Sequence, residues 1–299
     1  MIKRLEQILP LWGMEAGEIT QIYGTAWEVN HSHVVKIYHD REALERNIRI
    51  LTILCDCNIP AARIVPAGTG EKYIVCQQDY FLLTEKLEGS RVQDVKEEKM
   101  AWKMGFAIAC LHRAFLQCEK EMAFWENSLL EELRGWIRDN LTEDHWETIR
   151  EEEYERIVAG LEKGYELLPK QLIHRDVHFE NFLFSEGNFT GYLDFDLSQK
   201  NIRIFDLCYF LAGLLAEEGD TAFTKEEWLR TVKAALEGYE SVSGLTAEEK
   251  SAVPWVMEAI EILFAAFFIG LKDSRGAEEA CRILHFIQDC ETGLKGIAG

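Results

Sequence analysis

The stretch IHRDVHFEN at residues 173–181, followed by LDFD at residues 193–196, decides how this 299-residue sequence is interpreted. Asp176 precedes Asn181 by five residues, and Asp194 follows Asn181 after thirteen. The three polar side chains lie among strongly apolar neighbours. An aspartate alone is common in a turn, but the three together in this order and spacing indicate a shared chemical task.

Transfer of the γ-phosphoryl group of ATP is a task that suits these side chains. It needs an acceptor hydroxyl held in line with the phosphorus and divalent cations that neutralise the phosphates. In an H-x-D-x-x-x-x-N loop Asp176 orients or deprotonates the hydroxyl, while Asn181 and Asp194 offer oxygen ligands that suit Mg²⁺. A predicted hairpin over 182–193 brings both ligands to one edge. His174 is predicted to support the loop backbone.

These motifs resemble those of the aminoglycoside phosphotransferase and choline kinase superfamily, which carries an H-G-D-x-H-x-x-N loop and then an I-D-F/W-x segment. The sequence reads HRDVHFEN and LDFD at these places. The resemblance implies that Asp176 is the catalytic base and that Asn181 and Asp194 hold Mg²⁺. His178 matches the second histidine of the loop. Asp196 either adds a metal contact or shapes the turn.

The resemblance extends over about residues 19–215. Within IFDL at 204–207 it makes Asp206 a structural residue that anchors the backbone of the catalytic loop. It implies an α+β, bilobal protein-kinase-like fold with a small β-rich N-terminal lobe and a larger, mostly helical C-terminal lobe. It also implies a small-molecule kinase that uses Mg²⁺ and ATP, with GTP not excluded.

Patterns along the chain agree with two lobes. Short β-type runs surround one helical stretch in the first part, and helical periodicity dominates from residue 96 onward. We predict strands at 34–38, 73–76 and 80–84 and a helix at 40–55. The apolar strand that ends at Gly89 marks the boundary, which gives a nucleotide-binding lobe at 1–89 and a catalytic and acceptor-binding lobe at 90–299.

Four residues of the first lobe are predicted to bind nucleotide. Lys36 stands in the apolar run VVKIY, where the resemblance implies a grip on the phosphates, although a strand lysine can also simply reach solvent. Gly24 occupies the turn above the phosphates or is only structural. The carbonyl of Glu85 and the amide of Leu87 take the place of the hinge that binds adenine through main-chain atoms.

Two positions depart from the family pattern. Asn47 stands where relatives carry a glutamate that pairs with the lysine, and Glu45 lies two residues away, on a different face of the helix. Either the helix is shifted and Glu45 pairs with Lys36, or Lys36 is held differently. The glycine of H-G-D is replaced by Arg175.

Two other classes of protein compete with a small-molecule kinase. A protein Ser/Thr kinase is disfavoured because only twelve residues separate Asp194 from Asp206, too few for an activation and peptide-docking loop, and no A-P-E-like segment follows. A pseudokinase or nucleotide-binding module is suggested by Asn47. The intact Asp176, Asn181 and Asp194 favour an active enzyme.

The acceptor is constrained mainly by charge. The net charge is −20, which disfavours nucleic acid as a partner, and residues 119–166 alone carry −9. This acidity favours a cationic amino-sugar or amino-alcohol, although it is also typical of a solvated surface. Glu258 and Glu261 share one face of an apolar helix and are candidate acceptor-binding acids, unless they line the solvent edge of a core helix.

Composition also limits location and partners. The apolar stretch 252–271 is interrupted by Pro254, Glu258 and Glu261, so it is predicted to be a buried helix and not a membrane span. No charged-then-apolar leader begins the sequence, and the eight scattered cysteines are typical of reduced, buried thiols, which together predict a cytoplasmic protein. We expect a monomer or weak homodimer whose partners are a nucleotide and a small-molecule acceptor.

Overall fold

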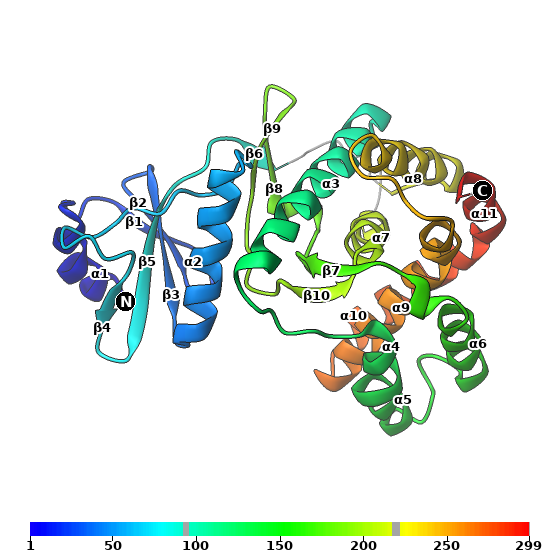
Figure 1. Cartoon of the computed structure of the whole chain (residues 1–299). Coiled ribbons are helices and arrows are strands. Elements are labelled where there is room, and N and C mark those ends of the chain that lie inside the picture. The colour runs from blue at the N-terminus through cyan, green and yellow to red at the C-terminus, as the bar shows by residue number, and fades with distance from the viewer. Residues whose placement is uncertain (92–95, 217–221, 299) are drawn as a thin grey trace. The chain divides into compact units, whose positions relative to one another are not determined.

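The computed structural model describes residues 1–91, 96–216 and 222–298, drawn in Figure 1. The chain forms two compact units, one made of residues 1–91 with 182–196 and the other of the remaining residues. The first unit therefore runs two residues past the predicted boundary at Gly89, and it includes a later segment of the chain. The lobe boundary at Gly89 stays a prediction.

The first unit is built on an antiparallel five-stranded sheet with strand order β1-β2-β3-β5-β4. The predicted β-rich lobe is confirmed. The strands are β1 (Ile19–Tyr23), β2 (Ala26–Val29), β3 (His33–Tyr38), β4 (Ile74–Cys76) and β5 (Asp79–Glu85).

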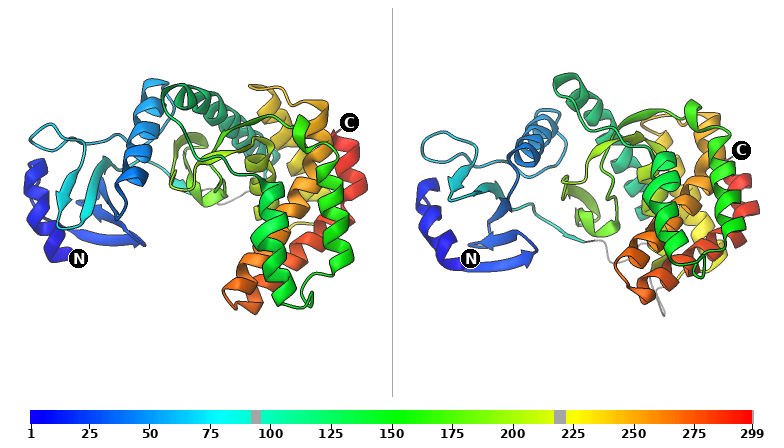
Figure 2. Two further views of the ribbon diagram at one scale, coloured as in Figure 1. Left: turned by 60° about the horizontal axis from the view of Figure 1, so that its bottom comes forward. Right: turned by 90° about the horizontal axis from the view of Figure 1, so that it is seen from below.

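Two helices cover opposite faces of this sheet (Figures 1 and 2). Successive side chains of β3 point to opposite faces, so Val35 packs with Leu5 of α1 (Ile2–Ile8) in one apolar cluster, whereas Tyr38 meets Asn47 of α2 on the other side. Helix α2 (Arg41–Asp56) is close to the predicted 40–55. Helix α1 and the 3₁₀ turn Leu9–Trp12 lie before the first predicted strand and were not predicted.

A three-stranded sheet completes the first unit, with order β6-β8-β9. Its strands are β6 (Ser90–Arg91), β8 (Phe182–Ser185) and β9 (Asn188–Tyr192). The two-residue turn between β8 and β9 has positive φ at Glu186 (51°) and Gly187 (73°), as a tight hairpin requires. The predicted hairpin is thus present. The Tyr192 amide donates to Pro60 O at 3.1 Å, which ties the hairpin to the first 91 residues.

The second unit is mostly helical, as predicted (Figure 1). Its longer helices are α3 (Glu98–Glu121), α6 (Glu151–Glu162), α7 (Ile204–Gly213), α8 (Lys225–Glu240), α9 (Ala247–Gly270), α10 (Ser274–Asp289) and α11 (Glu291–Ala298). Helix α4 (Leu129–Glu132) connects to α5 (Arg138–Glu143) through Leu133–Ile137, which is kinked at Gly135, where φ is −100° and ψ is −119°. A two-stranded antiparallel sheet joins β7 (Lys170–Ile173) to β10 (Gln199–Ile202).

Helices α3 and α8 approach each other through glycines. A Cβ atom on Gly105 would lie 1.9 Å from the carbonyl oxygen of Ala235, and one on Gly238 would lie 2.0 Å from that of Trp102. Neither backbone has room for a side chain, so the small residues set the distance between these two helices.

Helix α9 is the apolar helix predicted over 252–271, and it packs against α6, α7 and α10. By length and composition alone it is long and apolar enough to cross a membrane, but 67% of its most apolar window is buried inside the described structure. A core helix has the same composition.

Glu249, Glu258 and Glu261 of α9 lie in this core. Glu249 receives two 2.7 Å bonds from Arg203, and Glu258 receives one of 2.7 Å from Arg156. Glu261 is 2% exposed. Burial raises the pKa of the Glu261 carboxyl to about 8, with a further increase from Glu279 and an opposing effect of Arg282. Glu261 is therefore mostly protonated at neutral pH.

We expect Glu261 to make stability depend on pH. Because its folded pKa of about 8 lies above the ordinary value of 4.5, its contribution is fully present below pH 4.5 and is lost as pH rises towards 8. Glu261→Gln removes this loss. The melting temperature of the variant relative to the wild type should rise between about pH 5 and 8 and level off above, since each pKa unit is worth about 1.4 kcal/mol.

Glu248→Gln, on the exposed first turn of α9, is the matched control, and its melting temperature should follow the wild-type pH profile. A constant difference between Glu261→Gln and the wild type from pH 5 to 9 would contradict a neutral buried carboxyl.

Candidate active site

The loop that follows β7 is fixed by the buried carboxylate of Asp206 on α7. Its two oxygens accept from the backbone amides of His174 (2.7 Å) and Arg175 (2.9 Å). The imidazole of His112 lies 2.9 Å from the same carboxylate and 2.8 Å from the hydroxyl of Tyr239. The side chain of His174 is buried beneath the loop, where its Nδ1 lies 3.4 Å from the Asp176 amide.

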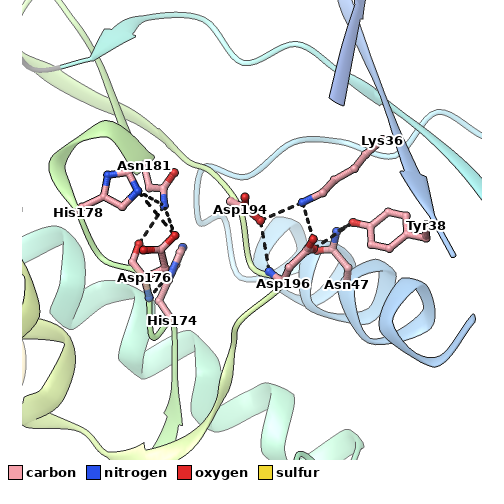
Figure 3. Close-up of polar contacts among 9 residues, drawn as sticks. All are labelled: Lys36, Tyr38, Asn47, His174, Asp176, His178, Asn181, Asp194 and Asp196. Carbon is pink, nitrogen blue, oxygen red and sulfur yellow. Dashed lines mark hydrogen bonds and ion pairs between the residues drawn. The ribbon is translucent and has the colours of Figure 1, made fainter. Parts of the chain in front are cut away.

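Asp176 is held on both carboxylate oxygens, and Figure 3 shows the contacts from Asn181 and His178. Tyr209 OH donates to Oδ1 at 2.8 Å, and Asn181 Nδ2 donates to Oδ2 at 3.1 Å and to the Asp176 carbonyl at 2.9 Å. Nε2 of His178 lies 3.6 Å from Oδ2. The Asp176 side chain is 23% exposed. Burial alone would raise the pKa of Asp176, but His178 and Tyr209 outweigh it and lower the pKa, so the group is a carboxylate at neutral pH.

Arg175 adopts a backbone conformation that favours glycine, with φ of +74°. Its Nη2 donates to both carboxylate oxygens of Glu132, at 3.0 and 2.8 Å, and the two side chains are each 13% exposed. The guanidinium carbon lies 4.3 Å from the ring centre of Phe205. These contacts compensate for the unfavourable backbone and tie the loop to α4.

Lys36 pairs with two carboxylates within the first unit (Figure 3). Its Nζ lies 2.9 Å from Oδ1 of Asp194 and 2.8 Å from Oδ2 of Asp196. Burial by itself lowers the pKa of Lys36, but Asp196 and Asp194 outweigh it and raise the pKa, so the ammonium stays charged. Tyr38 OH donates to Asp196 at 3.3 Å, and the buried Asn47 donates to the same hydroxyl.

This arrangement decides between the two alternatives left open for Lys36. Glu45 is exposed and bonds to Arg41 at 2.8 Å, so the alternative in which it pairs with Lys36 is wrong. Residues 45 and 47 lie on different faces of α2, and only Asn47 faces the sheet. Lys36 is held by Asp194 and Asp196, and Asn47 supports Asp196 through Tyr38.

The other nucleotide-binding candidates lie at turns and strand ends. Gly24 forms the tight turn between β1 and β2, with φ of +45°, and its carbonyl accepts from Gln21. Glu85 is the last residue of β5. Within the described ranges no acceptor is found for the Leu87 amide, so it is available to a ligand.

The two acids predicted to bind the acceptor are not accessible as free carboxylates. Glu258 is 1% exposed and paired with Arg156, and Glu261 is 2% exposed and mostly protonated. A solute meets neither group at the surface, so the geometry does not support this prediction. Nor do they line a solvent edge, which was the alternative.

No group of three or more His, Cys, Asp or Glu side chains capable of holding a metal ion occurs in the part of the chain that is described. Mg²⁺ does not require one, because it is typically bound by one or two carboxylates together with phosphates and water. Within the first unit, the exposed carboxylates of Asp194 and Asp196 are hard donors that fit this requirement. The amide oxygen of Asn181, in the second unit, is a donor of the same kind.

Three contact residues were missed by sequence reasoning. Tyr209 lies three residues after Asp206 and shares a face of α7 with it, and Tyr38 lies two residues after Lys36 on the same face of β3, so spacing was a usable signal for both. Glu132 lies 43 residues before Arg175, and nothing in its local sequence marks it as the partner.

Comparison with known proteins agrees with these motifs. Residues 21–249 match the model of the phosphotransferase enzyme family. The homoserine kinase of Polaromonas naphthalenivorans (strain CJ2) is 27% identical over 171 residues, covering 52% of this chain and 48% of that protein. That of Phenylobacterium zucineum (strain HLK1) is 31% identical over 97 residues, covering 32% and 28%. The chain thus matches about half or less of the length of these relatives.

Solved structures share the fold. An amicoumacin kinase in complex with AMP-PNP, Ca²⁺ and Ami is 16% identical, with a TM-score of 0.73 over 97% of this chain and 92% of that one. The GDP complex of aminoglycoside 2'-phosphotransferase-IIIa is 14% identical, with a TM-score of 0.66 over 97% and 98%. Choline kinase from Cryptosporidium parvum Iowa II is also 14% identical, with a TM-score of 0.65 over 99% and 96%.

The predicted α+β kinase-like fold is therefore confirmed, and so is the family that the loop motifs indicated. Because the family model covers well over half of the sequence, the chain belongs to the phosphotransferase enzyme family.

Proposed function

We propose that this protein transfers the γ-phosphoryl group of ATP to a hydroxyl of a small molecule, with Asp176 as the catalytic base. The observation that carries the proposal is the state of Asp176: an ionised carboxylate, partly open to solvent, with both oxygens oriented by fixed donors. General bases are held in this way. Membership of a family of small-molecule kinases supports the same reaction.

In the proposed reaction the acceptor hydroxyl donates a hydrogen bond to Asp176. As the acceptor oxygen forms a bond to the γ-phosphorus, the bond from that phosphorus to the bridging oxygen of ADP breaks, and the hydroxyl proton passes to the Asp176 carboxylate. The transition state of such transfers is loose, so orientation of the hydroxyl contributes more than deprotonation. Tyr209 and Asn181 supply that orientation by fixing the carboxylate.

The remaining predicted residues serve the nucleotide in this proposal. Lys36 exchanges its contacts with Asp194 and Asp196 for the phosphates, and the freed carboxylates would hold Mg²⁺ together with Asn181. When bound, the ion supplies neutralisation of the phosphate charge. Adenine contacts through the main chain at Glu85 and Leu87 would not by themselves distinguish ATP from GTP.

Replacing the proposed base tests the catalytic assignment. Asp176→Asn keeps the size of the side chain but removes its basicity, so turnover should fall by about 10² to 10⁴ while affinity for Mg-ATP is kept. Coupled ADP release measures turnover, and titration calorimetry measures affinity. Asp139→Asn, on the exposed side of α5, is the control. Full activity of Asp176→Asn would overturn the mechanism.

The nucleotide assignment is tested separately by affinity for Mg-ATP. Lys36→Met and Asp194→Asn should each weaken it by at least about tenfold, the usual value of a charge-assisted contact. Glu45→Gln should leave this affinity unchanged, because Glu45 is exposed and bonds to Arg41 at 2.8 Å. Thermal stabilisation of the wild type by Mg-ATP, without ADP release for any acceptor, would favour a nucleotide-binding module over an enzyme.

The tie between Arg175 and Glu132 is expected to position the catalytic loop. Arg175→Gly restores the residue that the family motif carries but removes both bonds to Glu132. We expect kcat to fall about tenfold with little change in the KM for ATP, because the loop loses its link to α4. Glu132→Ala should lower kcat by a similar factor, and the double variant should have a kcat no lower than that of either single variant. Wild-type kcat in Arg175→Gly would show that the tie has no role in positioning.

A further inference from the structure

A row of three aromatic side chains begins at the proposed base. Tyr209, whose hydroxyl donates to Asp176 at 2.8 Å, has its ring centre 5.6 Å from that of Phe264, and Phe264 lies 6.3 Å from Phe268 in a stacked arrangement. All three members of this aromatic row are partly exposed. Tyr209 comes from α7 and the two phenylalanines from α9, helices that pack together in the second unit (Figure 1).

The segment of α9 that carries the two phenylalanines is apolar. Residues 262–271 of the chain contain no ionisable side chain. Phe267, whose ring centre lies 5.4 Å from that of Phe268, is 47% exposed. Contiguous exposed apolar side chains of this kind usually mark a binding surface, and aromatic walls with a few convergent polar groups are typical of small-molecule sites. Here the polar groups are Asp176 and the hydroxyl of Tyr209.

The neighbouring helix leaves room for this arrangement. A Cβ atom on Gly276 of α10 would lie only 2.5 Å from the ring of Phe268. Glycine at this position therefore lets the ring lie flat against α10. The packing holds Phe268 in place, so the row is preformed and needs little ordering when a ligand binds.

Some acids near the row are neutralised, but Asp273, at the Phe268 end, is exposed: its amide donates to Phe268 O at 2.9 Å and its carboxylate accepts from Gly276 N at 3.1 Å. Glu261, within electrostatic range of Tyr209, is buried and mostly protonated at neutral pH. Glu258 is paired with Arg156, and Glu132 with Arg175. Asp176 itself must accept the hydroxyl. Glu261, Glu258 and Glu132 therefore offer an acceptor no free carboxylate.

We propose that the aromatic row binds the body of the acceptor, and that the acceptor is a hydroxyl compound with an aromatic or flat apolar body. The inference rests on the proposed kinase function and names its substrate class. The hydroxyl reaches Asp176 while the body stacks on Phe264 and Phe268, since aromatic faces attract flat apolar groups. This class differs from the cationic acceptor that net charge favoured.

The test compares alcohols that differ in the body next to the hydroxyl: 2-(2-naphthyl)ethanol, choline, homoserine and kanamycin. We expect coupled ADP release to give the highest kcat/KM with 2-(2-naphthyl)ethanol. Phe264→Leu and Phe268→Ala should raise its KM about fivefold to tenfold, with kcat and the affinity for Mg-ATP nearly unchanged. Phe106→Ala is the matched control, because Phe106 is 41% exposed and stacks on Trp102 of the same helix, α3.

Direct binding separates this inference from the proposed function. The fluorescence of the naphthyl ring reports binding without turnover. If binding is weakened in both row variants but no compound releases ADP, the site is supported and the kinase function fails. If choline, homoserine or kanamycin is the best substrate and the row variants leave its KM unchanged, the kinase function stands and the inference is overturned. Absence of naphthyl binding to the wild type also overturns it.

Discussion

The geometry of the candidate active site depends on one buried carboxylate, Asp206, which accepts from two consecutive backbone amides of the catalytic loop. Buried amides without partners are costly, so the loop is most stable where both bonds form. The same helix turn presents Tyr209, which orients the oxygen of Asp176 that Asn181 does not reach. One helix therefore sets both the path of the loop and the direction of the proposed base.

A second constraint is the charge of Lys36, which the chain satisfies without the usual glutamate. Lys36 lies between Asp194 and Asp196. The Tyr38 hydroxyl donates to Asp196 and accepts a hydrogen bond from Asn47. Because α2 carries Asn47 where the family pattern has a glutamate, one negative charge fewer lies near Lys36. The lysine then depends on the two aspartates that are also the proposed metal ligands, and in the proposed function nucleotide and metal binding are coupled through them.

The two departures from the family motif have physical explanations of the same kind. At Arg175 the backbone is left-handed, which costs a residue with a side chain roughly 1 kcal/mol or more, and the bonds to Glu132 and contact with Phe205 offset it. At Asn47 a tyrosine hydroxyl takes the place of an ion pair. Arg175 pairs with Glu132, 43 residues away, and Asn47 reaches Asp196 only through Tyr38, so motif reasoning identified the departures but not their consequences.

The sequence by itself determined the two-lobed α+β fold, the hairpin after the catalytic loop, and the family, because these follow from local periodicity, turn residues and a motif of fixed spacing. It did not predict helix α1, since seven residues with mixed polarity carry little signal. Only the tertiary structure decided which residues hold Lys36 and that Glu258 and Glu261 are buried. It also decided that Phe264 and Phe268 form a row with Tyr209. These depend on packing between distant segments, which local pattern does not encode.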